Sequence, residues 1–398
     1  MGGAGVLAVH PGGVCNQRCL KPAFAPERPP ADSPKSHGRK NLSEDENGLI
    51  FDCHLDLAMN AVHWNRDLTK SLEEIREREQ GQTDKLDRGN GVVNFEEMRS
   101  AGIRICVATQ IGHSVSQKSP LPGWNSPEIA WSQTRAQLAW YREMERMGLL
   151  VPISKRSHLH RHLENIDSGK EIGYLLSLEG ADSLVHLDYL QQIYDDGVRL
   201  IGPAHYGPGR YAAGTGEKEG FTARGKELLR EMEARNMVLD VTHLTDRGFD
   251  EALELYGGPI LASHHNCREF VEHQRQLSDD QIRRLIRRDA IIGVAFDAWM
   301  LVPDWVRGQT TPAQSGVSLE HIANNIDHVC QLAGSASHSA IGSDLDGAFG
   351  NEQTPVEIRS IAHLPLLKQV LLDRNYDAAS LDGILFGNAF RFFDKNLP

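Results

Sequence analysis

The sequence contains no apolar run long enough to cross a bilayer as a helix, which takes about 20 residues. Its first residues, MGGAGVLAVHPGGV, lack the basic start and the continuous apolar segment of a secretory signal. Val6 also stands where a myristoylation motif requires Ser or Thr. From these features we expect a cytoplasmic protein with no evident membrane anchor.

Cysteine and positive charge are also scarce. The chain of 398 residues has 6 cysteines, too few and too scattered for a disulfide framework. They are Cys15, Cys19, Cys53, Cys106, Cys267 and Cys330. The first two form an isolated CxxxC in a Pro-rich stretch, which we interpret as incidental. The formal net charge is -12, from 54 acidic and 42 basic residues, which argues against a surface built for nucleic acid.

The chain also lacks a GxGxxG motif after its first apolar run, so a dinucleotide-binding fold has no support. Residues 1–46 are rich in Pro, Gly, Ser and charge, which predicts a flexible extension and not a domain. After this region, short apolar runs alternate with longer amphipathic stretches to the end of the sequence. We therefore predict one domain over residues 47–398.

The apolar runs are short and aliphatic or β-branched, which is typical of strands buried on both faces. They cover residues 49–54, 103–109, 172–179, 198–205, 237–243, 259–264, 290–296 and 339–344. Predicted helices lie between them, for example over residues 125–148, 221–236 and 318–334. An alternation repeated about eight times is the pattern of an α/β fold of the (β/α)8 TIM-barrel type. An open, doubly wound sheet is the competing architecture.

Chemically versatile side chains lie at the ends of most of these runs, and this regularity favours the barrel. The residues are His54 with Asp56, Glu179, His205, His243, His264 and Asp344. In a barrel, the carboxyl ends of all strands face one mouth, where barrel enzymes place their chemistry. In an open sheet, the outer strands would hold these residues too far apart to form one site.

The first pair, His54 and Asp56, has the spacing that places two side chains on the same face of a strand. Both side chains can then bind one metal ion. Taken alone, the pair is equally compatible with a histidine that caps a turn and an aspartate that caps the next helix. Its weight comes from the residues at the other strand ends.

Glu179, His243 and His264 complete a candidate ligand set. A carboxylate at the end of an apolar run needs a partner, either a cation or a metal ion. Five ligands are too many for one open tetrahedral zinc, but they suit two metal ions that share Glu179. We expect two Zn²⁺ ions that activate a bridging hydroxide, with Mn²⁺, Co²⁺ and Fe²⁺ left open. His265 we expect in the second shell or at the surface.

Three further residues could serve catalysis and substrate binding. His205 could stabilise an oxyanion, and Asp344 could move a proton from water to the leaving amine. Arg275 could bind a substrate carboxylate through its guanidinium, although a loop arginine is more often a solvated surface charge. Asp344 could instead cap a helix, a role that we assign first to Asp346.

With these residues assembled, the sequence resembles the membrane (renal) dipeptidase family of zinc metallopeptidases, peptidase family M19. The matching motifs are DCHLD, SLEGAD, PAHYG, LDVTH, ASHHN, HQRQLSDD and GSDLDG, followed by GNAFRFF near the end. They carry, in order, His54 with Asp56, Glu179, His205, His243, His264, Arg275 and Asp344. The resemblance extends from about residue 49 to the end of the chain and is specific, because eight roles fall in the family's order.

The resemblance implies a dipeptidase that hydrolyses dipeptides with a free C-terminal carboxylate. Family members tolerate D-residues at the C-terminal position, some open β-lactam rings, and dimers are common, so a homodimer stays open. The chain departs from the family at Cys53, where Gly is common, at Leu55, where Asn is usual, and in an aromatic segment over residues 58–68. These departures concern substrate preference more than the metal site.

Two other classes of protein stay open. One is an amidohydrolase that acts on N-acyl amino acids, cyclic amides or lactams. Many such enzymes bridge their metals with a carboxylated lysine, and no lysine ends a predicted strand here. The other is a barrel without activity that serves as a binding protein, for which a lost ligand would be the sign. All five expected ligands are present.

Overall fold

Parallel strands alternate with helices through the residues that the computed structural model describes, 48–166 and 171–398. These residues belong to one unit, Leu42–Pro398. The extension predicted for residues 1–46 lies outside the described residues, as do Cys15 and Cys19. Cys53, Cys106 and Cys267 are buried and free.

Eight strands form a closed parallel barrel, which confirms the predicted fold class. Their order is β7-β6-β5-β4-β2-β1-β9-β8. The ring closes between β7 and β8, where Ala262 donates its N–H to the carbonyl of Ile291 at 3.0 Å. Gly293 returns a hydrogen bond to the carbonyl of Ala262 at 2.9 Å. The bounds are β1 Ile50–Leu55, β2 Ile103–Ile111, β4 Ile172–Glu179, β5 Val198–Gly202, β6 Val238–Asp240, β7 Ile260–Leu261, β8 Ile292–Val294 and β9 Ser339–Ile341.

Each predicted run contains a strand, but the structure shortens most of them and adds one. The added strand, β3 (Leu150–Pro152), pairs with the first residues of β4, while β5 pairs with the last ones. From β5 onward, the strands end before the polar residues that close the predicted runs. His243 and Asp344 have φ angles of 68° and 58°, a left-handed conformation that a strand does not contain. The apolar pattern continues past the point where the backbone leaves the sheet.

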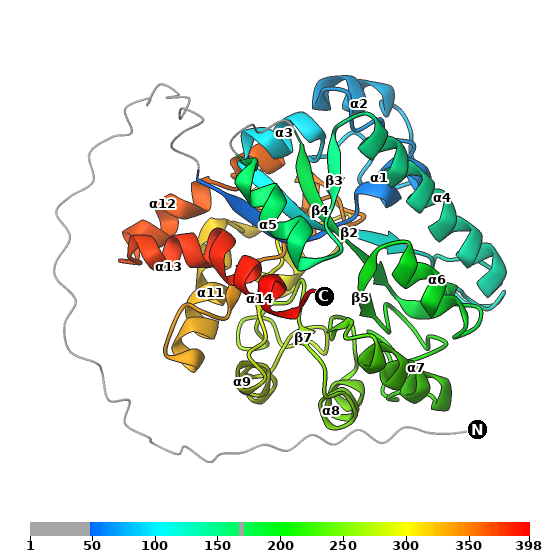
Figure 1. Cartoon of the computed structure of the whole chain (residues 1–398). Helices are drawn as coiled ribbons and strands as arrows, with labels where there is room; N and C mark the ends of the chain where they lie inside the picture. The colour runs from blue at the N-terminus through cyan, green and yellow to red at the C-terminus, as the bar shows by residue number, and fades with distance from the viewer. Residues whose placement is uncertain (1–47, 167–170) are drawn as a thin grey trace, which may run out of the picture. The chain divides into compact units, whose positions relative to one another are not determined.

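Helices pack around the outside of the barrel (Figure 1). The three helices whose residue ranges we predicted are present as α4 (Pro127–Arg146), α7 (Ala223–Ala234) and α11 (Leu319–Ala333). The other α-helices are α1 Leu57–His63, α2 Leu72–Arg78, α3 Phe95–Ser100, α5 Arg156–Glu164, α6 Tyr189–Asp195, α8 Asp246–Leu255, α9 Asp279–Arg287, α10 Pro312–Ser315, α12 Leu366–Asp373, α13 Ala378–Asp382 and α14 Asn388–Asn396. Short turns of other helical types are Ala181–Ser183, Ala298–Met300, Asn351–Gln353, Ile361–His363 and Gly383–Gly387. Among the described residues, none of the helices is both long and apolar enough to cross a membrane.

The barrel interior is filled by apolar side chains at one end and lined by polar ones at the other. Alternate residues of the strands point inward and form an apolar layer that includes Phe51 and Leu175. Helix α14 lies across this end, where Phe393 stacks on Phe51 with ring centroids 5.3 Å apart (Figure 1). Further along β4, the same inward alternation passes through Ser177 to Glu179. The polar residues therefore gather at the carboxyl ends of the strands, as in other barrel enzymes.

Candidate metal centre

Glu179 lies at the centre of the strand-end cluster. Its side chain is buried, and its two oxygens face different neighbours. Oε2 lies 3.4 Å from Nε2 of His54, while Oε1 lies 3.3 Å from Nε2 of His243 and 3.5 Å from Nε2 of His264. A carboxylate placed in this way can bind one cation through each oxygen.

His54 and Asp56 approach Glu179 from β1. Nε2 of His54 lies 4.0 Å from Oδ1 of Asp56, so both can reach one ion between them. Asp56 also accepts a hydrogen bond from the hydroxyl of Thr109 on β2. The 3.4 Å approach of Glu179 is not an aligned hydrogen bond, so buried Nε2 of His54 has no hydrogen-bond partner among the residues described. An orphaned buried nitrogen of this kind fits a metal ligand.

Hydroxyl groups orient the two later histidines. Nδ1 of His243 lies 3.1 Å from the hydroxyl of Thr215, and Nδ1 of His264 lies 2.9 Å from the hydroxyl of Ser263. These contacts turn the two Nε2 atoms toward each other, to 3.3 Å, and toward Glu179. Metal-binding histidines are commonly oriented through the second ring nitrogen in this way.

The structure thus brings all five predicted ligands together. Within 48–166 and 171–398, three groups have ligand atoms within 4.8 Å of one another. They are His54 with Asp56 and Glu179, Glu179 with His243 and His264, and His54 with His264 and Asp344. The first two share Glu179 and divide the residues as the two-metal prediction does. The third places Asp344 beside the cluster, with Oδ1 3.7 Å from Nε2 of His54.

The charges of the cluster favour a bound cation. Burial raises the pKa of Asp56 to about 6, and Glu179 adds to this effect. Burial also raises the pKa of Asp344 well above its ordinary value, with Asp56 and Glu179 contributing. Burial disfavours a charged His54, but the surrounding carboxylates outweigh it and raise the pKa of His54 to about 10. Three carboxylates in one buried space attract positive charge, which a divalent ion would supply.

The remaining imidazoles are in the form that binds metals. Burial lowers the pKa of His243 and of His264 well below the ordinary value, and the Arg275 cation contributes to both shifts. His205 lies just outside this pair, with Nε2 3.9 Å from Oε1 of Glu179 and a side chain 23% exposed. Burial lowers its pKa to about 4. These neutral rings can bind a cation or donate a hydrogen bond.

Arg275 is buried beside the cluster, contrary to the solvated state usual for a loop arginine. Its Nη2 donates a hydrogen bond to the carbonyl of His264 at 2.9 Å. Its Nε and Nη1 are buried without a hydrogen-bond partner in the described part of the chain. Buried guanidinium nitrogens need an acceptor, and a planar carboxylate matches their geometry.

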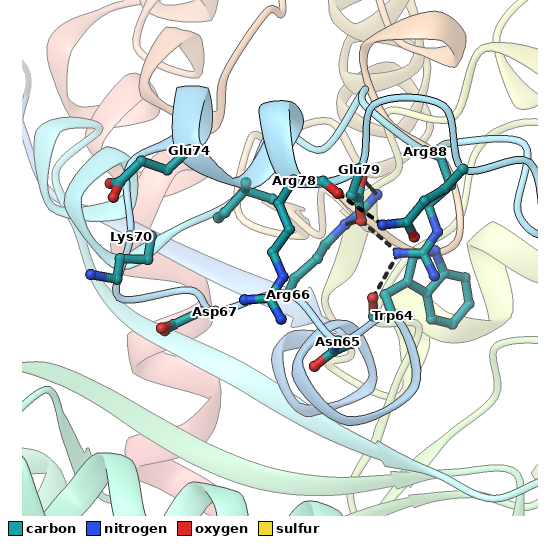
Figure 2. Close-up of a pocket in the computed structure, with 11 residues that line it drawn as sticks. Trp64, Asn65, Arg66, Asp67, Lys70, Glu74, Arg78, Glu79 and Arg88 are labelled. Carbon is teal, nitrogen blue, oxygen red and sulfur yellow. Dashed lines mark hydrogen bonds and ion pairs between the residues drawn. The ribbon is translucent and has the colours of Figure 1, made fainter.

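A buried ion network positions the loop that carries Asp344. Asp346, two residues further on, accepts hydrogen bonds from the backbone of Val92 and Val93 and lies 3.7 Å from Nη1 of Arg66. Asp346 therefore links the loop after β9 to the segment that contains Val92 and Val93, whereas we predicted only a capping role for it. Arg66 also pairs with Glu79, at 2.8 Å (Figure 2).

The sequence analysis missed His113 at this mouth and left the position of His265 open. His113 follows β2, with Nδ1 2.8 Å from Asp182, and its ring lies edge-on to His205 at 6.0 Å. It escaped notice because β2 extends two residues beyond the predicted run. His265 is buried and neither ring nitrogen has a hydrogen-bond partner among the described residues, so the surface alternative that we left open for it is wrong.

The chain belongs to the membrane dipeptidase family. The model of the family described as "Membrane dipeptidase (Peptidase family M19)" matches residues 45–396, which are most of the sequence. A crystal structure of a metallo peptidase from Rhodobacter sphaeroides, liganded with a phosphinate mimic of the dipeptide L-Ala-D-Ala, has the same fold. Its TM-score is 0.71 at 21% identity, over 88% of this chain and 99% of that one.

Curated relatives match over shorter stretches. Dipeptidase aclJ of Aspergillus oryzae is 27% identical over 247 residues, which are 61% of this chain and 55% of that protein. An uncharacterized protein encoded near pqqA in Klebsiella pneumoniae is 31% identical over 210 residues, or 51% of this chain and 73% of that protein. The matches thus span about half to three quarters of these relatives.

Proposed function

We propose that this protein is a dipeptidase with two metal ions, and that it hydrolyses dipeptides carrying a free C-terminal carboxylate. The observation that carries the substrate assignment is Arg275, a buried guanidinium with two unpartnered nitrogens next to the carboxylate and imidazole cluster. The membership of the metallopeptidase family supports the reaction class.

His54 and Asp56 would hold one ion and His243 and His264 the other, with Glu179 shared between them. The chemistry of the donors, which are imidazoles and carboxylates, fits two divalent ions such as Zn²⁺. Bound there, such ions lower the pKa of water to near neutrality and polarise an amide carbonyl. The hydroxyl groups of Thr215 and Ser263 orient the histidines for this task.

The chain's own groups would do the remaining work. Arg275 holds the substrate carboxylate and so fixes the position of the scissile amide. His205, at the rim of the cluster, donates a hydrogen bond to the oxygen that becomes negative. Asp344 accepts a proton from the attacking water and passes it to the nitrogen of the leaving amino acid.

A second candidate is the hydrolysis of N-acyl amino acids, in which Arg275 would serve in the same way. One observation favours it. The cavity next to His205 has no carboxylate among its described lining residues, so a free α-ammonium would have no anionic partner there. If the substrate is a dipeptide, its α-ammonium instead faces the carboxylates of the metal centre.

A paired measurement tests the proposal. Metal per chain is determined on protein purified without chelator, and the same sample is assayed on L-L and L-D dipeptides and on N-acyl amino acids. About two metal ions with cleavage of dipeptides would support the dipeptidase assignment. Two ions with cleavage of N-acyl amino acids alone would move the assignment to the second candidate. Failure to hold metal after reconstitution would overturn both.

A further inference from the structure

A cavity of about 510 Å³ opens beside the metal centre. His205 and Tyr206 are among its lining residues, and Nε2 of His205 lies 3.9 Å from Oε1 of Glu179 in the cluster. Its volume lies within the range of about 300–1,000 Å³ that is typical of small-molecule pockets.

The walls of the cavity come from segments after β1 and β2. Met59 and Val62 line it from α1, and Leu121 and Trp124 line it from the loop after β2. Two backbone hydrogen bonds tie this loop, from Val115 to the carbonyl of Trp124 and from Trp124 to the carbonyl of His113, each at 2.8 Å. The loop therefore holds its apolar side chains in place over the cavity.

The position of the cavity assigns it to one half of the substrate. In the closed ring, β2 and β7 are separated by three strands on either side, so they lie opposite each other. Arg275 lies over β7, where it bonds the carbonyl of His264, and it does not line the cavity. A substrate with its carboxylate on Arg275 and its amide at Glu179 extends its acyl half toward β1 and β2. The acyl half is the N-terminal residue of a dipeptide.

The described lining is largely apolar and aromatic, with Gln133, three imidazoles and one lysine as its polar groups. The lysine is Lys85, and its Nζ lies 4.6 Å from the ring centroid of Trp64. Aspartate and glutamate are absent from the described residues that line the cavity. A cationic side chain would therefore meet Lys85 without a counter-ion, while an aromatic or branched one would remove apolar surface from water.

We propose that this cavity binds a large apolar group without positive charge on the acyl side of the scissile amide, and that Trp124, Val62 and Lys85 determine this preference. The proposal rests on the proposed function, because it uses Arg275 and the metal centre to orient the substrate. The side chain of an N-terminal residue and a free acyl chain share the required chemistry, and the substrate panel distinguishes them.

The experiment measures kcat/KM for substrates that differ only on the acyl side, with alanine as the leaving residue. The panel contains Phe-Ala, Leu-Ala, Ala-Ala, Lys-Ala and phenylacetyl-Ala. We expect Phe-Ala and Leu-Ala to exceed Ala-Ala by about tenfold or more, as apolar pockets discriminate by this order. Lys-Ala should be the poorest of the four dipeptides. Superior cleavage of phenylacetyl-Ala would support the proposal with a free acyl chain as its occupant.

Variants connect the preference to the cavity. Val62→Trp should fill it and lower the ratio of Phe-Ala to Ala-Ala, and Trp124→Ala should lower the same ratio by removing a wall. Lys85→Glu should raise kcat/KM for Lys-Ala relative to Leu-Ala. The matched control is Lys155→Glu, which makes the same charge change at an exposed residue that does not line the cavity. Lys155 directly precedes α5, whose first residue, Arg156, donates its backbone N–H to the carbonyl of Pro398. Lys155→Glu should leave every ratio unchanged.

The outcomes distinguish a failure of the cavity assignment from a failure of the proposed function. Good turnover of Ala-Ala with no gain for Phe-Ala and Leu-Ala would overturn the cavity assignment and leave the proposed function intact. The same holds if Val62→Trp and Lys85→Glu, folded and loaded with metal, leave the ratios unaltered. Lack of turnover on all five substrates by metal-loaded protein would overturn the proposed function itself.

Discussion

Glu179 is the residue on which the two-metal interpretation depends, because each of its oxygens faces a different set of imidazoles. Glu179→Gln keeps the size of the side chain but removes its charge and one of its two acceptor oxygens. We expect it to retain less metal and to lose at least about 100-fold in kcat/KM, since even second-shell changes cost 10–100-fold. Elemental analysis and steady-state kinetics measure both effects.

The control for this substitution is Glu96→Gln, at an exposed position of α3. It should retain metal and activity like the parent protein. Two metal ions per chain and full activity in Glu179→Gln would be incompatible with a bridging role for this residue.

Substitutions of Arg275 test the proposal that the substrate carries a free carboxylate. Arg275→Ala should raise KM for free-acid dipeptides about 30-fold or more, because loss of a buried charged hydrogen bond weakens binding by about 2 kcal/mol or more. The corresponding dipeptide amides should change much less, since they carry no carboxylate. Arg275→Lys should rescue only part of the loss, as lysine keeps the charge but not the planar fork. An equal effect on acids and amides would remove the carboxylate-binding role.

At the scale of elements, the network around Arg66 joins segments that are distant in sequence. Its guanidinium bonds Asn60 of α1 at 2.8 Å and Asp87 at 2.9 Å, besides Glu79 and Asp346. Asn60 in turn donates hydrogen bonds to the carbonyls of Asp56 and Asp346, at 3.1 and 2.8 Å. The segment after β1 and the loop after β9 are thus held by one buried cluster. Arg66 and Glu79 of this cluster also line a cavity of about 290 Å³ (Figure 2).

Arg66→Ala should therefore lower the free energy of unfolding by about 3–5 kcal/mol, the effect of leaving buried charges unpaired. The matched control is Arg146→Ala, which removes an exposed pair with Glu143 and should leave stability unchanged within error. Urea unfolding of both variants measures the difference. If the two variants are equally stable, the network contributes nothing beyond a surface ion pair.

The strands and the barrel were predictable at this scale because buried parallel strands have an apolar pattern that the sequence displays directly. The loops were not. The apolar pattern runs on into residues such as His243, which has left the sheet, and so it cannot mark where β6 ends. Arg275 received its role through the family resemblance, because the sequence does not indicate that a loop arginine is buried. His113 was missed because β2 continues through Gln110 to Ile111, beyond the end of the predicted run at Thr109.

At the scale of the whole molecule, the metal centre joins residues from β1, β4, β6 and β7, or from the loops that follow them. Ions bound there would bind only the folded barrel, so they should stabilise it by about 2.7 kcal/mol when free metal exceeds Kd 100-fold. We expect chelation to lower Tm by several degrees and to abolish dipeptide hydrolysis. Differential scanning calorimetry before and after dialysis against chelator measures the shift.

Glu179→Gln separates this stabilisation from an effect of the chelator on the barrel itself. Because this variant should hold less metal, chelator should change its Tm less than that of the parent protein. Re-addition of Zn²⁺ should restore both Tm and activity of the parent protein. If chelator leaves the Tm of both proteins unchanged, bound metal contributes nothing to the stability of the barrel. The clustered carboxylates would then need another explanation, since burial without a cation raises the pKa of Asp344 so far.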